Sequence, residues 1–159
     1  MPFTTSLRNI IPGLLFACIL VGCDKSTTDN TPTTEDKISA TTWKFSKATA
    51  NSTDISALIQ ACYKDNTLQF TKASPQNTGK LNEGATKCNA ADPQERGFTW
   101  VYDASFQKIT ITGTTGAIAI LPGGSNELTL VRVSATEMVV SQNVTFAGAT
   151  QLVEVTLIP

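Results

Sequence analysis

Apolar and polar residues alternate along most of the second half of the chain, and this alternation restricts the possible folds more than any other feature. From Gly97 onward, apolar residues recur at every second position in short runs, as in Phe98, Trp100 and Tyr102. A period of two is typical of a β-strand with one face against a core and the other in water. Further strands are predicted at residues 108–112, 117–121, 128–133, 138–140 and 152–157.

Turn-forming residues separate these runs, so the predicted strands have local connections. Residues 113–116 contain two glycines and predict a hairpin turn, and residues 122–126 begin with Pro-Gly-Gly and predict a longer one. Residues 134–137 predict another turn. Strands joined in this way pair with their sequence neighbours, which predicts an antiparallel meander.

The preceding part of the chain shows the same alternation less regularly. Strands are predicted around Trp43 and Phe45 and around Leu68 and Phe70, with a weak strand at 79–81 and a loop at 82–96. With about eight or nine short strands in all, the simplest way to avoid exposed edges is closure into a barrel. A β-sandwich is the alternative architecture.

One segment between the first two predicted strands has helical spacing. Four apolar residues occur at positions i, i+3, i+4 and i+7, and they are Ile55, Leu58, Ile59 and Cys62. Such spacing gives one apolar stripe. We therefore expect one short helix near the N-terminal end of the domain, lying on the barrel or plugging its end. A helix that binds a partner is the less favoured alternative.

The N-terminus has the pattern of a targeting signal. Residues 10–21 are almost wholly apolar and follow Arg8, which is the organisation of a signal peptide. This run is shorter than the roughly 20 residues that a membrane-spanning helix needs, and it is interrupted by Pro12 and Gly13.

The end of the apolar run, Leu20-Val21-Gly22-Cys23, resembles the lipobox of bacterial lipoproteins. The resemblance implies cleavage between Gly22 and Cys23 and acylation of Cys23, with lipids such as palmitate. Several acyl chains on one residue anchor a protein stably. The alternative is an ordinary secreted protein in which Cys23 forms a disulfide. The expected organisation is a signal peptide at 1–22, a lipidated cysteine and flexible linker at 23–40, and a domain at 41–159.

The remaining cysteines predict a disulfide. Cys18 is removed with the signal peptide and Cys23 is lipidated, which leaves Cys62 and Cys88. Outside the bacterial inner membrane the surroundings are oxidising, so one disulfide is expected. Two buried free thiols are the alternative.

The segment from Cys62 to Phe70, Cys-Tyr-Lys-Asp-Asn-Thr-Leu-Gln-Phe, resembles a stretch of small lipocalin-like lipoproteins of Bacteroidetes-type bacteria. Cys88, the strand at 98–100 and residues 128–141 match the same pattern. The resemblance implies an eight-stranded up-and-down barrel and a Cys62–Cys88 bridge, but no particular function. Residues 122–126 and 142–150 look longer than the usual connections of that family, which leaves the strand register there open.

The composition argues against several functions. The chain has no histidine, which removes His-based zinc sites and Ser-His-Asp or Cys-His catalysis. Its 12 basic and 13 acidic residues give no basic surface for nucleic acid. Asp65 and Asn66 are typical of a turn from helix to strand. We therefore expect neither an enzyme nor a cofactor or metal site.

The expected function is binding of a small apolar or amphipathic molecule by a lipid-anchored barrel in the cell envelope, at the outer membrane. The alternative is a filled barrel that serves as an interaction module for another envelope protein. An eight-stranded barrel can either enclose a ligand or be filled by its own side chains. The residues that would line a ligand cavity or form the core are Trp43, Phe45, Phe70, Phe98, Trp100 and Tyr102.

Overall fold

The computed structural model of the chain describes residues 31–113, 120–146 and 148–159, which belong to one compact unit at 31–159. The expected signal peptide, the expected acylation site at Cys23 and most of the expected linker lie outside the described residues. The same is true of residues 114–116 of the expected hairpin turn and of residues 117–119 of the expected strand.

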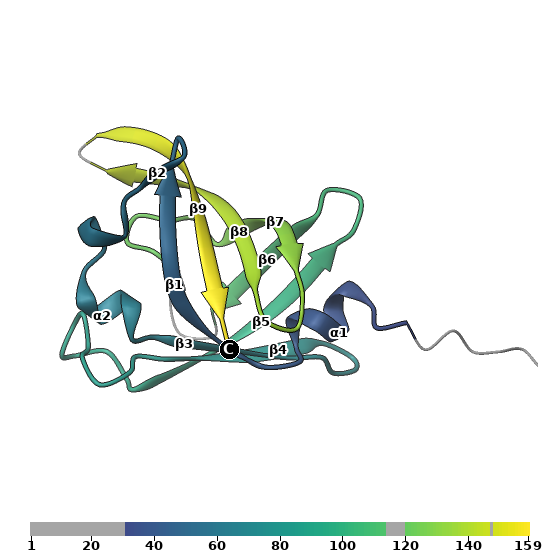
Figure 1. Cartoon of the computed structure of the whole chain (residues 1–159). Helices are drawn as coiled ribbons and strands as arrows, with labels where there is room; N and C mark the ends of the chain where they lie inside the picture. The colour runs from purple at the N-terminus through teal and green to yellow at the C-terminus, as the bar shows by residue number, and fades with distance from the viewer. Residues whose placement is uncertain (1–30, 114–119, 147) are drawn as a thin grey trace, which may run out of the picture. The chain divides into compact units, whose positions relative to one another are not determined.

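Within the described residues, eight strands form a closed antiparallel barrel (Figure 1). They are β1 (Thr42–Ala50), β3 (Thr67–Thr71), β4 (Asn77–Asn82), β5 (Glu95–Asp103), β6 (Lys108–Gly113), β7 (Glu127–Val133), β8 (Met138–Phe146) and β9 (Ala149–Ile158). Each strand pairs with the next one in this order, and β9 pairs back with β1. A two-residue strand, β2 (Thr53–Asp54), folds back on the end of β1. The expected antiparallel barrel is confirmed, and the sandwich alternative is wrong.

Strands β8 and β9 are longer than the sequence suggested. Residues 142–150 look like an extended connection, but they pair in continuous register from Gln142 with Val153 to Phe146 with Ala149. Only residues 147 and 148 lie between the two strands. Gly148 has a φ of 82°, a conformation that suits glycine in a tight turn.

The folded domain begins before residue 41, inside the segment expected to be linker. Helix α1 (Thr34–Ile38) starts with a capping box, in which Asp36 N donates to Thr33 Oγ1 and Thr33 N donates to the Asp36 carboxylate. Ile38 is fully buried, and its carbonyl accepts a 2.7 Å hydrogen bond from Trp43 Nε1. The described end of the expected linker is therefore part of the core.

The helix expected along the stripe from Ile55 to Cys62 is broken into two short pieces, η1 (Ser56–Leu58) and α2 (Ala61–Lys64). The first piece is tied to β1, because Ser56 Oγ accepts from Ala48 N at 2.9 Å. Ile55 N donates to Ala48 O at the same distance. Ile59 then adopts an extended backbone. The segment follows the barrel rim instead of continuing as a helix.

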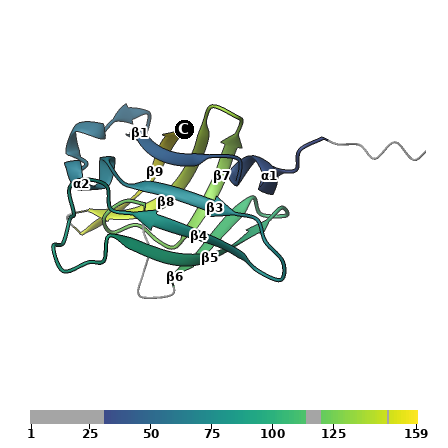
Figure 2. The ribbon, with the colours of Figure 1, turned by 90° about the horizontal axis from the view of Figure 1, so that it is seen from below.

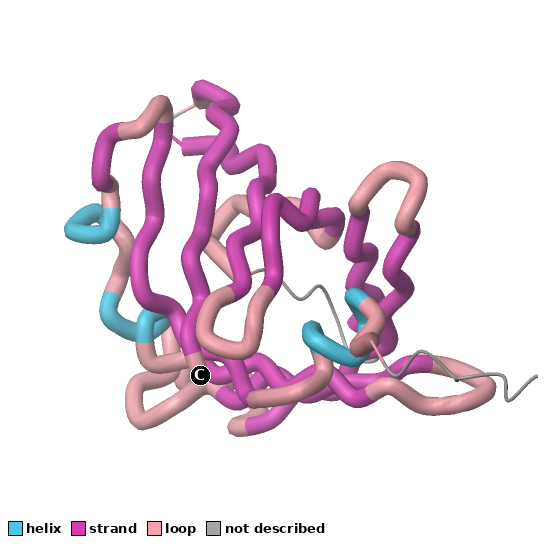
Figure 3. The backbone as a smooth tube through the Cα atoms, turned by 45° about the vertical axis from the view of Figure 1, so that its right-hand side comes forward, coloured by secondary structure: helices cyan, strands magenta, loops and turns pink. Residues whose placement is uncertain are grey.

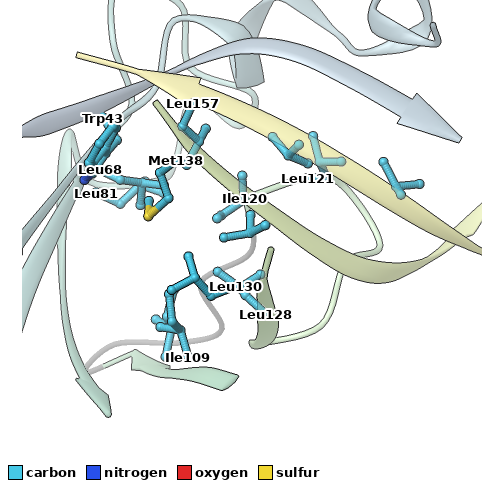
Figure 4. Packing of buried hydrophobic residues seen from close by; sticks show 14 of the residues in the cluster. Trp43, Leu68, Leu81, Ile109, Ile120, Leu121, Leu128, Leu130, Met138 and Leu157 are labelled. Atoms are coloured by element: carbon cyan, nitrogen blue, oxygen red, sulfur yellow. The ribbon is translucent and has the colours of Figure 1, made fainter. Parts of the chain in front are cut away.

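Aromatic side chains fill one half of the barrel interior. Phe70 packs edge-on against Phe98, with ring centroids 5.3 Å apart, and against Trp100 at 5.5 Å. Gly79 on β4 lies over the Phe98 ring and leaves no room for a side chain there. Apolar side chains without aromatic rings fill the interior next to these aromatic residues (Figure 4), among them Leu68, Leu81, Ile109, Leu128, Met138 and Leu157.

The described part of the β6–β7 connection places two apolar side chains inside the barrel. Ile120 and Leu121 are buried, and Figure 4 shows Ile120 pointing among the core side chains between Met138, Leu130 and Leu157. A turn follows, in which Gly124 N donates to Leu121 O and Gly123 has a φ of 69°. We call residues 120–124 the plug. Residues 120 and 121 are not part of a strand, so the described end of the strand expected at 117–121 is wrong.

Candidate functional site

The barrel has two structurally different ends. Helix α1, where the described chain enters, lies at one end together with the β3–β4 connection, to which it is tied by an ion pair between Asp36 and Lys72. Helix α2 lies at the other end (Figures 1 and 2). That end also carries η1, the β4–β5 loop and the plug, and we call it the mouth. Figure 3 shows the two helical segments η1 and α2 beside the β1 strand.

An apolar pocket of about 150 Å³ opens at the mouth, and we call it the mouth pocket. Three segments far apart in the sequence form it: the η1 region, the plug, and the mouth ends of β8 and β9. Its lining residues are Ile55, Leu58, Ile59, Leu121, Pro122, Val144, Gln151 and Val153. Leu58 is 66% exposed, so apolar surface continues onto the rim of the pocket.

Two sets of hydrogen bonds fix the walls of the mouth pocket. The η1 wall is held to β1 by the Ser56 and Ile55 bonds described above. The plug wall is held to β8, because Thr145 N donates to Gly123 O at 3.3 Å and Gly124 forms a bridge with Val144. Both segments that carry the pocket's lining side chains are therefore held to strands of the barrel.

A buried amide lies next to the mouth pocket. Gln142 of β8 is 2% exposed and occupies the inward position before Val144, directly across from Val153 of β9. Among the described residues neither its amide nitrogen nor its oxygen has a hydrogen-bond partner. The carboxamide packs against Gly124 so closely that a Cβ on that glycine would lie 2.5 Å from Gln142 Oε1.

A second pocket of about 150 Å³ lies on the other side of the plug. Its walls are polar and include Tyr63, Asp92 and a buried ion pair between Glu83 and Arg96. Leu121 and Pro122 line both this pocket and the mouth pocket. The plug therefore separates an apolar pocket from a polar one.

A disulfide between Cys62 and Cys88 holds the β4–β5 loop beside α2, as expected. Its Cα atoms are 5.1 Å apart, within the range usual for a disulfide. Asp65 supports the same loop, because its Oδ2 accepts from Ala85 N at 2.9 Å and from Thr86 N at 2.8 Å. With its amide oriented to satisfy both partners, Asn66 donates to the carbonyls of Cys62 and Glu83.

These contacts give Asp65 and Asn66 a second role besides the expected turn. The pair does lie at the transition from α2 into β3. Their side chains also fasten the loop that carries Cys88, a role that the local sequence does not reveal because the partners are about 20 residues away.

The six aromatic residues expected to line a cavity or form the core are all buried or partly buried. Trp43, Phe70, Phe98 and Trp100 are fully buried, and Phe45 and Tyr102 are partly buried against them. The space beside Trp43 and Phe45 is about 10 Å³, which is room for one water at most. None of the six lines the mouth pocket.

Sequence reasoning identified only part of the mouth pocket. The apolar stripe predicts that Ile55, Leu58 and Ile59 share one surface. No pattern in the sequence predicts that residues of the plug, β8 and β9 join them. One signal was present in the sequence: on β8 the alternation that places Val140 and Val144 inward also places Gln142 inward. A polar residue at an apolar position of a strand is the kind of exception that marks a functional site.

No known protein-family model matches the chain, and no curated protein matches it. Among the described residues, no helix has the length and apolar character needed to cross a membrane. The part of the chain that the structure describes also contains no group of three or more Cys, Asp or Glu residues placed to hold a metal ion.

Proposed function

We propose that this protein is a lipid-anchored binding protein of the bacterial envelope, with a lipocalin-like barrel whose mouth pocket holds the apolar part of a small amphipathic molecule. The observation that carries the proposal is the mouth pocket itself. Seven of its eight lining residues are apolar, and it opens to solvent beside the exposed Leu58. Apolar pockets with few polar groups are typical sites for small ligands.

The volume of the pocket limits the ligand. Pockets for drug-sized molecules are usually about 300–1,000 Å³, whereas the mouth pocket is about 150 Å³. An apolar cavity of about 150 Å³ can hold a benzene ring. The proposed ligand therefore places one apolar group of about six carbons in the pocket, and its remainder stays outside the filled barrel.

A second candidate function is docking onto another envelope protein. The packed interior favours it, because the space beside the core residues Trp43 and Phe45 is only about 10 Å³, whereas many barrels enclose a ligand. In that case the apolar rim around Leu58 would contact a partner, and no small molecule would be bound.

Native mass spectrometry of the mature protein, extracted from membranes in mild detergent, separates the two functions. The proposal predicts a bound small molecule that is lost on denaturation. It also predicts that Val144→Phe, which fills the pocket, abolishes this extra mass. Asn143→Phe is the matched control, because Asn143 is exposed on the other face of the same strand. A bare mass for the wild-type protein would contradict ligand binding and favour docking.

A further inference from the structure

Gln142 is buried at a position where the fold does not require a polar side chain. Its neighbours on the inner face of β8 are Val140 and Val144, and its partner across the sheet is Val153. A buried amide without partners is unfavourable because it has lost its hydrogen bonds to water. An apolar residue of similar size would avoid this loss, so the domain carries a polar group that its own packing does not use.

The carboxamide is placed where a ligand in the mouth pocket could reach it. Val144 and Val153 both line the pocket, and Gln142 lies one inward position deeper on β8, level with Val153. Gly124 of the plug packs directly against the carboxamide. Two consecutive glycines, Gly123 and Gly124, form this part of the turn. Glycine allows backbone rearrangements that other residues resist.

From this arrangement we propose that Gln142 is the polar recognition residue of the mouth pocket, and that the ligand is a neutral molecule carrying a hydroxyl, carbonyl or amide group on its buried apolar end. The inference rests on the proposed function and names its ligand class. A carboxamide offers both a donor and an acceptor, so it can pair with any of these groups. Ligand entry displaces Gly124 from the carboxamide, at the expense of the hydrogen bond between Thr145 N and Gly123 O, and gives the unpaired amide its partner.

Benzene and phenol test this assignment, because both fit the pocket and they differ by one hydroxyl. Binding of each to the mature protein is measured by calorimetry, for the wild type, Gln142→Leu and Asn143→Leu. Phenol should bind the wild type at least about fivefold more tightly than benzene, in line with one additional hydrogen bond to a buried group. Gln142→Leu should reverse this preference, whereas Asn143→Leu, an exposed control on the same strand, should retain it.

The thermal stability of the variants gives an independent readout. Removing an unpaired buried amide should raise the Tm of Gln142→Leu by about 3 °C or more, whereas Asn143→Leu should leave it nearly unchanged. Benzene binding without a preference for phenol would overturn the role of Gln142 and leave the proposed function standing. Absence of binding by both probes would contradict the proposed function together with the inference. A lower Tm for Gln142→Leu than for the wild type would show that the amide is paired in the free protein, which would also overturn the role of Gln142.

Discussion

Gly79 lies where the barrel leaves no room for a side chain, so Gly79→Ala is a sharp test of how the core is packed. A Cβ at this position would lie 2.2 Å and 2.3 Å from two atoms of the Phe98 ring and 2.6 Å from Gln69 O of the neighbouring strand. Carbon atoms in van der Waals contact are about 3.5–4.0 Å apart. The ring would therefore have to move by more than about 1 Å, although it is buried and packs edge-on against Phe70.

The expected cost follows from this clash. Overpacking a core typically destabilises a protein by about 1–3 kcal/mol. Replacing glycine by alanine in a strand would otherwise recover about 0.4–1 kcal/mol through the unfolded chain. Because the clash involves backbone as well as a ring, we expect the free energy of unfolding of Gly79→Ala to fall by about 2 kcal/mol. Lys80→Ala, at an exposed position on the same strand, should change it by less than about 0.5 kcal/mol.

A double-mutant cycle measured by urea unfolding identifies the cause. Phe98→Leu removes the ring atoms nearest to the new methyl group, so the two substitutions together should cost at least about 1 kcal/mol less than the sum of their separate costs. Additive costs, or a Gly79→Ala protein as stable as the wild type, would refute the packing described for this half of the barrel.

Three further predictions concern the cysteines and the α1 end. Replacing Cys62 and Cys88 by alanine should lower the free energy of unfolding by roughly 3–4 kcal/mol in urea, and a reductant should then have no further effect on the variant. The pKa of Asp36 is held well below its usual range by hydrogen bonds from Lys72 and from the capping residue of α1. A lowered pKa stabilises the fold above the carboxyl's ordinary pKa of about 3.9. Asp36→Asn should therefore lower the Tm at pH 7, and its difference from the wild type should shrink as the pH falls below about 4; a constant difference would contradict the ion pair. Cys23→Ala should release the protein from the membrane fraction and abolish labelling by a fatty acid, and continued membrane attachment would exclude the lipobox assignment.

The strands could be predicted because their sequence pattern depends on burial alone. Leu68 with Phe70, Phe98 with Trp100, and Ile109 with Ile111 are buried in the structure, and polar residues between them face outward. Closure could also be anticipated, because many short strands with local connections otherwise leave exposed edges. The strands and their closure can be predicted without knowing which distant residues are in contact.

The remaining elements depend on contacts between distant residues. Helix α1 is five residues long and contains one apolar side chain, so its position rests on the contact of Ile38 with Trp43. The expected helix is interrupted at Ile59 and Gln60, which adopt an extended backbone, while Ser56 bonds to Ala48 of β1. Ile120 and Leu121 resemble the end of a strand, yet they enter the barrel as the plug.

The mouth pocket could not be predicted for the same reason. It gathers residues from η1, the plug and two strands, and no local pattern indicates that the apolar stripe at Ile55, Leu58 and Ile59 meets the other segments. Its residues become a set only when the barrel closes and places β9 beside β1.

Methyl NMR during titration with benzene tests the central claim most directly, since it locates a bound apolar group residue by residue. The mouth pocket predicts saturable shifts of the Ile55, Ile59, Val144 and Val153 methyl signals, without shifts at Ile109 in the filled core. Val144→Phe should abolish these shifts, and Asn143→Phe should preserve them. No saturable shift at the mouth, or shifts centred on the filled core, would contradict the account.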